Sequence, residues 1–194
     1  MSQPPTPQEV PSDDVQEVIR AVQLCLTGTE VPTKLTWRMG LFDAWANRVF
    51  IGKIAPHLLA VRKAADAGDL NAIIAADNSL AGGENSTAAG RAWLGRQRGA
   101  KHANLLPNLA AALAAGQVAG EFHTVLALQA SNFHVGHLPM LQAALYCEWR
   151  AARSDSGTPF SVEEFLRRTR SVMSQLPALV TAHVPTAPIS AAGR

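Results

Sequence analysis

The chain has 194 residues, 47% of them hydrophobic, which is enough for one domain with a full core. Its formal charge of +2 is too small to indicate a nucleic-acid-binding protein. Only 16% of its residues are charged, which favours a partly apolar surface that partners can use. No apolar run approaches the roughly 20 residues of a membrane span, and the polar, acidic start contains no signal peptide. We therefore expect a cytoplasmic protein that binds neither membrane nor nucleic acid.

The first half of the chain predicts four helices after a short tail. Residues 1–11 are proline-rich and polar, and we expect them to be disordered. Helices are then predicted over about 12–26, 35–51, 56–68 and 69–80. Proline opens the third of these helices, and a Gly-Asp pair separates it from the fourth.

The middle of the chain contains the clearest loop and the most apolar helices. Residues 81–86 form the loop, and Ser86 is predicted to cap a helix that ends near residue 102. A short alanine-rich helix follows over 107–116. Residues 121–152 predict two helices that meet at a corner, around which the other helices pack. In this corner Gly136 is predicted to be the left-handed C-cap, and Pro139 falls in the first turn of the next helix.

The last helix has the cleanest amphipathic stripe. After a second loop at 154–159, Ser161 and Glu164 form a capping box, and Pro177 is predicted to end the helix. We expect a folded domain over 12–178 and a flexible tail over 179–194. Because no strand-like alternation or internal repeat occurs, the sequence predicts a single all-α orthogonal bundle of about eight or nine short helices.

No pattern in the sequence predicts catalysis. The Gly52-Lys53 pair lacks both the upstream glycine and the following Ser or Thr of a phosphate-binding loop. A nucleophile elbow is absent, and no pair of carboxylates lies in an apolar setting that would raise their pKa values. Cys25 and Cys147 lie in apolar helical patterns without metal-binding spacing, and we expect them to be buried thiols in a reducing compartment. We therefore expect a protein that is not an enzyme.

His134 and His137 are the candidate metal ligands. They lie three residues apart at the predicted corner, with His123 and Glu121 nearby in the sequence. A protein metal site needs three or four converging ligands, and only two are adjacent here. The pair therefore has two interpretations: capping or surface histidines, or a transient metal site.

Two aromatic groups have a binding interpretation beside a structural one. Trp93 lies among Arg91, Arg96, Arg98 and Lys101, which could form a phosphate-binding face with the tryptophan as a stacking platform. A solvated helix face around a buried tryptophan explains the same pattern. A second aromatic group could line a ligand pocket or belong to the core, and its members are Trp37, Phe42, Trp45 and Phe50.

One segment near the N-terminus resembles a family motif. Val22-Gln23-Leu24 precede Val31-Pro32-Thr33-Lys34-Leu35-Thr36-Trp37-Arg38-Met39-Gly40-Leu41-Phe42. The sequence resembles the UreF family of urease accessory proteins, in which a Leu-Gln-Leu helix precedes Leu-Pro-(Ser/Thr)-Gly-(Gly/Ala)-Phe-x-x-Ser-x-Gly-Leu-Glu. The positions that match, with a one-residue gap, are Pro32, Thr33, Trp37, Gly40 and Leu41. Lys34 and Leu35 stand where the family has its paired glycines. Arg38 stands in place of the serine, and Phe42 in place of the glutamate.

The resemblance continues to about residue 180. Pro56 and the Gly68-Asp69 pair are similar to the family's proline-led helix and Gly-Asp helix start. The segment 121–153 is similar to its paired helices, which end in an Ala-x-Leu-Tyr type sequence, here Ala143-Ala144-Leu145-Tyr146. The family's Gly-Gln turn is altered, because Thr158 follows Gly157.

The resemblance implies an all-α maturation factor without catalytic activity. Such a protein is a homodimer that binds the accessory protein UreH (also called UreD), recruits the GTPase UreG, and supports nickel delivery to apo-urease. It binds no cofactor stably and handles nickel only transiently, with His134 and His137 as candidate relay groups. The candidate partner contacts are Tyr146, Trp149, Arg150 and Arg153, because aromatic residues and arginine are favoured at interfaces.

Two other functions fit an all-α chain of this size. One is a maturation chaperone for redox enzymes or molybdoenzymes, which the identity of the partner would distinguish. The other is a regulatory or ligand-binding domain that binds nucleic acid through the segment 91–101. This alternative predicts binding to nucleic acid that weakens as the salt concentration rises.

Overall fold

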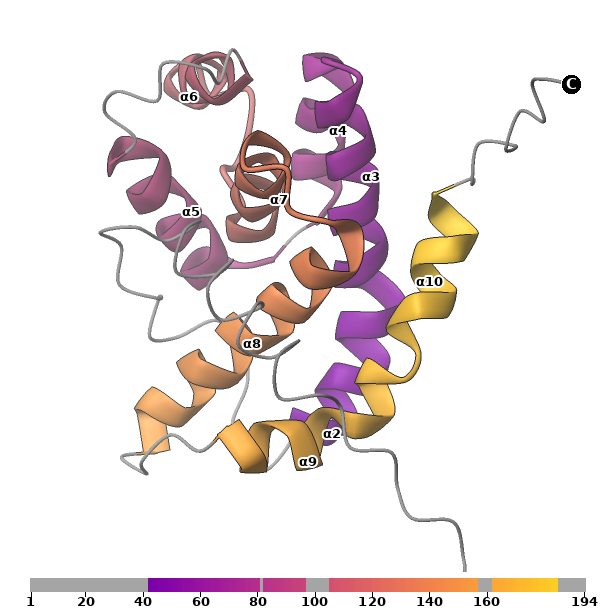
Figure 1. Ribbon diagram of the computed structural model, residues 1–194. Helices are drawn as coiled ribbons and strands as arrows, with labels where there is room; N and C mark the ends of the chain where they lie inside the picture. Colours follow the sequence, from indigo (N-terminus) through magenta and orange to yellow (C-terminus); the bar gives the residue numbers. More distant parts are fainter. Residues whose placement is uncertain (1–41, 81, 97–104, 157–161, 185–194) are drawn as a thin grey trace, which may run out of the picture.

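The computed structural model describes residues 42–80, 82–96, 105–156 and 162–184, and the side chains of residues 96, 152–156 and 162 are not among the described ones. The described part is a compact all-α bundle without a strand, which confirms the predicted fold class (Figure 1). Its elements in chain order are α2 (Phe42–Trp45), the π-helix η2 (Ala46–Ile54), α3 (Ala55–Asp66), α4 (Leu70–Leu80), α5 (Glu84–Arg96), α6 (Leu105–Ala114), α7 (Phe122–Asn132), α8 (His137–Ser156), α9 (Val162–Met173) and α10 (Leu176–His183). The predicted tail at 1–11, the helix at 12–26 and Cys25 lie outside the described residues.

Helix α7 is the central element. Every residue from Glu121 to Ala130 is buried, and α7 contacts α3, α4, α5, α6 and α8 (Figure 1). This burial follows from the sequence, because α7 is apolar over more than one face and can pack on several neighbours at once. The predicted pair of helices is therefore confirmed as α7 and α8.

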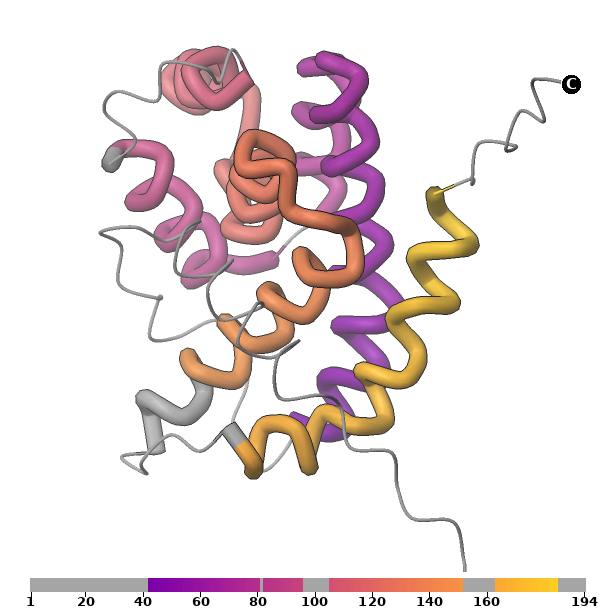
Figure 2. The backbone as a smooth tube through the Cα atoms, viewed as in Figure 1, coloured from indigo at the N-terminus to yellow at the C-terminus, as the bar shows by residue number. Residues whose placement is uncertain are grey.

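The boundary between the second and third predicted helices is wrong. The chain runs from α2 through η2 into α3 without interruption (Figure 2). Pro56 lies in the first turn of α3, and a proline has no N–H to give to the preceding turn. The wider turns of the π-helix η2 come directly before it, so the segment stays helical although the α-helical pattern changes.

The predicted end of the last helix is also wrong. Pro177 does not end helical structure, because α10 begins at Leu176 and extends to His183, with the proline in its first turn. Proline is tolerated there, since the first N–H groups of a helix have no partner within it. Residues 179–183, assigned to a flexible tail from the sequence, therefore belong to a helix that packs on α3, α8 and α9.

Two buried carboxylates fix the start of α7. Asp77 accepts hydrogen bonds from the backbone N–H groups of Gly120 (2.8 Å) and Glu121 (2.9 Å). The Glu121 carboxylate accepts from the Gly82 N–H (2.8 Å) and from the Ser86 hydroxyl (2.5 Å). The burial of these two carboxylates, which are 0% and 2% exposed, was not anticipated from the sequence. The N–H and hydroxyl groups that donate to these carboxylates explain how two charged groups are tolerated at the buried start of α7. Ser86 is not the cap of α5 but lies inside that helix.

Candidate functional site

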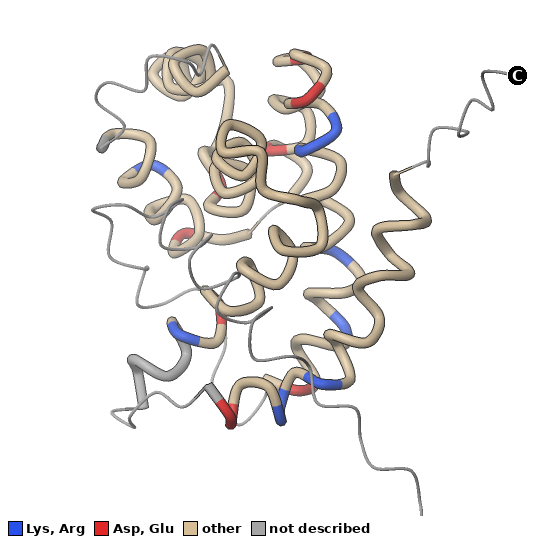
Figure 3. The backbone as a smooth tube through the Cα atoms, viewed as in Figure 1, with Lys and Arg blue, Asp and Glu red and all other residues tan. Residues whose placement is uncertain are grey.

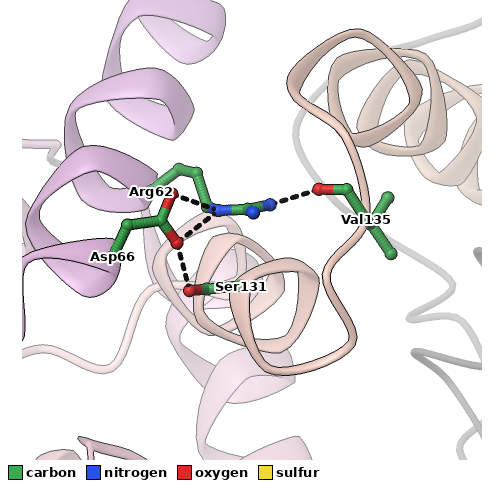
Figure 4. Close-up of polar contacts among 4 residues, drawn as sticks. All are labelled: Arg62, Asp66, Ser131 and Val135. Carbon is green, nitrogen blue, oxygen red and sulfur yellow. Dashed lines mark hydrogen bonds and ion pairs between the residues drawn. The ribbon is translucent and has the colours of Figure 1, made fainter.

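The corner between α7 and α8 is held against α3 by one polar cluster (Figure 4). The Arg62 side chain is buried and donates through Nε to both oxygens of Asp66, at 2.8 and 2.9 Å. Its Nη1 donates to the Val135 carbonyl, and Asp66 also accepts from the Ser131 hydroxyl at 2.6 Å. These bonds link α3 to the end of α7 and to the turn after it. Bonds to charged groups are stronger than neutral ones, so they restrict the turn to one position.

The turn itself is a Schellman motif with histidine where glycine is usual. The Val135 N–H donates to the Ala130 carbonyl (2.8 Å), and the His134 N–H donates to the Ser131 carbonyl (3.0 Å). His134 has φ 54°, the left-handed region. The predicted C-cap at Gly136 is therefore wrong, because the helix ends two residues earlier, where His134 takes the left-handed position.

The corner presents an aromatic side chain to solvent. Phe133 is 49% exposed, more than any other large hydrophobic residue in the described part of the chain. His134 beside it is exposed, and His137, the first residue of α8, is partly buried. Burial lowers the pKa of His137, and the nearby Arg62 guanidinium lowers it further, while Asp66 opposes the shift. The lowered pKa of His137 favours its neutral form.

His134 and His137 lack the further ligands of a stable metal site. Among the described residues, no group of three or more His, Cys, Asp or Glu side chains is placed to hold a metal ion. A stable site needs at least three protein ligands.

The predicted partner contacts on α8 differ in how far they are buried. Trp149 is 0% exposed and Tyr146 is 6% exposed. Both rings pack on Phe165 of α9, and Trp149 also meets Phe42 edge-on, with centroids 5.0 Å apart. Neither ring is available to a partner in this structure, because α8 is covered by α9 as well as by α3. Arg150 is exposed, and the side chain of Arg153 lies outside the described residues.

The two aromatic groups are part of the core where the structure describes them. Phe42 and Phe50 are buried, Trp45 packs against both, and the structural interpretation of this group is confirmed for these three residues. Trp93 is 1% exposed and stacks on Phe122, so it is not an accessible stacking platform.

Other predicted positions are placed only in part. Arg91 donates to the Ala119 carbonyl at 2.9 Å, across to the segment before α7. The other cations of the basic segment are not described: Arg98 and Lys101 lie outside the described residues, and so does the side chain of Arg96. The family-motif positions Pro32, Thr33, Trp37, Gly40 and Leu41 also lie outside them.

The sequence did not predict the polar contacts that cross the core. His57 of α3 is hydrogen-bonded to the Thr124 hydroxyl of α7 at 3.0 Å. On the next face of α7, His123 Nε2 lies 2.9 Å from a carboxylate oxygen of Glu148, and both side chains are buried. By contrast, the Arg62–Asp66 pair lies within α3 and has a sequence signal, since residues four apart on a helix are neighbours.

The corner presents the exposed aromatic ring of Phe133 on a turn that hydrogen bonds hold in place. No helix in the described ranges has the length and apolar character needed to cross a membrane. Comparison with protein-family models, curated proteins and solved structures finds no match to this chain.

Proposed function

We propose that this chain is a non-catalytic accessory protein of the UreF type. It would act as a homodimeric scaffold that binds UreH/UreD-type and UreG-type proteins while nickel is inserted into apo-urease with GTP. The observation that carries the proposal is the resemblance over about residues 15–180. The position of α7 and α8, where that family has its paired helices, supports it. An all-α bundle with a low charged fraction suits a protein whose surface serves as an interface.

The proposed partner surface has two parts. Arg150 on α8 is exposed, and Arg153 follows it in the same helix. Phe133 and His134 form the second part, at the corner that Arg62 holds in place. Arginine and aromatic side chains contribute strongly at interfaces when they are held rigidly, because less conformational entropy is lost on binding. His134 and His137 remain the candidate relay groups for nickel.

Reconstitution with purified partners tests the proposal. The full chain is mixed with the UreH/UreD-type protein, the UreG-type GTPase and apo-urease of its own host, and co-elution is followed by size exclusion. We expect a complex that Arg150→Ala with Arg153→Ala weakens by about tenfold or more. Phe133→Ala tests the corner, and Glu84→Ala, which changes an exposed residue of α5, is the matched control.

The outcome distinguishes the proposal from its alternatives. Absence of any complex with these three partners would overturn it. Recovery of a molybdoenzyme or redox enzyme from the host would favour the other chaperone class. The nucleic-acid alternative requires binding at low salt that weakens as salt rises, and the burial of Trp93 removes the aromatic platform on which it depended.

A further inference from the structure

The charges of this chain are divided between its N-terminus and the remainder. Residues 1–19 contain Glu9, Asp13, Asp14 and Glu17 and no lysine or arginine, so their formal charge is −4. Residues 20–194 contain all 17 Lys and Arg against 11 Asp and Glu, a formal charge of +6. The overall charge of +2 therefore hides two parts of opposite sign.

Four exposed cations lie on two elements, η2 and α9. Arg48 and Lys53 on η2 are five residues apart, one hydrogen-bonding step of a π-helix. Arg167 and Arg170 are i,i+3 neighbours on α9. In the part of the chain that the structure describes, none of these four forms an ion pair. We call these four side chains the basic face.

The two elements are held side by side. The Arg168 guanidinium of α9 donates to the Asp43 carboxylate of α2 at 3.0 Å. Asn47 of η2 accepts from the Ser171 hydroxyl (3.4 Å) and from the Gln175 amide (3.3 Å). Figure 3 shows the Lys and Arg positions of η2 and α9 along the lower right of the molecule, with acidic positions of α2 and α9 beside them.

The acidic residues of these elements do not neutralise the basic face. Asp43 is already paired with Arg168, as above. Glu163 and Glu164 are in the first turn of α9, one helical turn before Arg167 and Arg168, and in the described part of the chain neither forms an ion pair with Arg167 or Arg170. The four cations are therefore able to pair with carboxylates from another segment.

We propose that the acidic segment 9–17 of the same chain binds the basic face. The segment and the basic face belong to one chain, with 30 residues between Glu17 and Arg48, the first cation of that face. A connection of 30 residues is long enough to reach across a protein of this size, since an extended chain covers about 3.3 Å per residue, and it makes the contact intramolecular. Val10 lies among the carboxylates, and Val49, 38% exposed, lies next to Arg48, which adds an apolar contact. Exposed ion pairs are individually weak, so the contact is salt-sensitive and reversible. This inference is independent of the proposed function.

Zero-length cross-linking of the full chain tests the proposal. A carbodiimide joins a carboxylate to a lysine amine only in contact, and Lys53 is the lysine of the basic face. We expect peptides that join segment 9–17 to Lys53 at about 10 mM salt, where the Debye length is about 30 Å. Their yield should fall about fivefold or more at about 1 M salt, where that length is about 3 Å. Lys63, exposed on α3 and outside the basic face, is the internal control and should gain few such links.

Two variants complete the test. Arg48→Gln, Arg167→Gln and Arg170→Gln together keep Lys53 and should lower its links about fivefold. Arg91→Gln, a cation on α5, should leave them unchanged. The proposal is overturned if Lys53 and Lys63 are linked equally, or if no link to Lys53 forms at low salt. It is also overturned if a mixture of isotopically light and heavy chains gives mostly mixed links, because the segment would then bind a second copy.

Discussion

Gly90 of α5 lies against the backbone at Gly120, so closely that a Cβ at position 90 would be 2.1 Å from the Gly120 carbonyl oxygen. The same Cβ would be 2.8 Å from the Glu121 carbonyl carbon and from the Phe122 nitrogen. The neighbouring atoms belong to the backbone and cannot rotate away. The contact between α5 and α7, which brings Ser86 to Glu121, therefore depends on the missing side chain at position 90.

We expect Gly90→Ala to destabilise the protein by about 2 kcal/mol net, because overpacking of a tight contact costs about 1–3 kcal/mol and the upper end of that range applies where the clash is with backbone. Alanine favours a helix by about 1 kcal/mol over glycine, but this gain is smaller than the clash. Urea unfolding followed by far-UV circular dichroism measures the change. Gly95→Ala in the same helix is the matched control, since a Cβ there has no heavy atom within 4 Å. It should be neutral or stabilising, and equal effects of the two substitutions would contradict the close approach.

The left-handed His134 predicts a stabilising substitution. An L-residue in this region costs about 1–2 kcal/mol, and glycine avoids most of that cost. His134→Gly should therefore raise the free energy of unfolding by about 0.5–1 kcal/mol, measured in the same way. Gly116 has φ 70° in the equivalent motif after α6, and a Cβ there would have no heavy atom within 4 Å. Gly116→Ala is thus the reverse experiment and should destabilise by a similar amount. A loss of stability in His134→Gly would show that the imidazole itself stabilises the corner.

The Arg62 cluster predicts a larger loss at the same corner. Arg62→Met keeps the buried part of the side chain but removes the donors to Asp66 and to the Val135 carbonyl. We expect a loss of about 2 kcal/mol, since bonds to charged groups contribute about 1.5–3 kcal/mol. Lys63→Met, at an exposed neighbour on α3, should change stability by less than about 0.5 kcal/mol. Amide hydrogen exchange of residues 131–135 should rise in Arg62→Met only, and unchanged protection would contradict the role of Arg62.

The predictable part of this structure is the part that depends on local patterns. The spacing of Phe122, Val125 and Leu126 marks α7 as a helix with apolar faces, and the structure confirms it. The start of α7 was not predictable, because Asp77 and Ser86 lie 44 and 35 residues before Glu121 and meet it only in the folded chain. The prediction that Trp149 is accessible to a partner was wrong for a similar reason. An aromatic residue beside arginines fits an interface equally well, and only the packing of α9 on α8 shows that it is buried.

His57 gives the protein a predictable response to acid. The pKa of this histidine is lowered to about 4 from its usual 6.5, and burial is the largest cause. The nearby His123 and Lys53 lower it further, and Asp77 opposes them. Between these two pH values the unfolded chain binds a proton at position 57 that the folded chain excludes. The stabilisation from a neutral His57 is therefore complete above about pH 6.5 and is lost as the pH falls toward 4.

We expect this histidine to account for a loss of about 3 kcal/mol in the free energy of unfolding between pH 6.5 and 4, at about 1.4 kcal/mol per pH unit. Urea unfolding at half-unit steps of pH measures it. His57→Gln can keep a hydrogen bond to Thr124 but does not titrate, so it should remove most of the slope in this window while lowering stability at pH 7. His137→Gln is the control, because the pKa of that histidine is also lowered but its side chain is more exposed, and it should remove less of the slope. If the slope of His57→Gln equalled that of the unaltered protein, the proton excluded by the fold would have to belong to another group, and the contact between α3 and α7 at His57 would not be the acid-sensitive one.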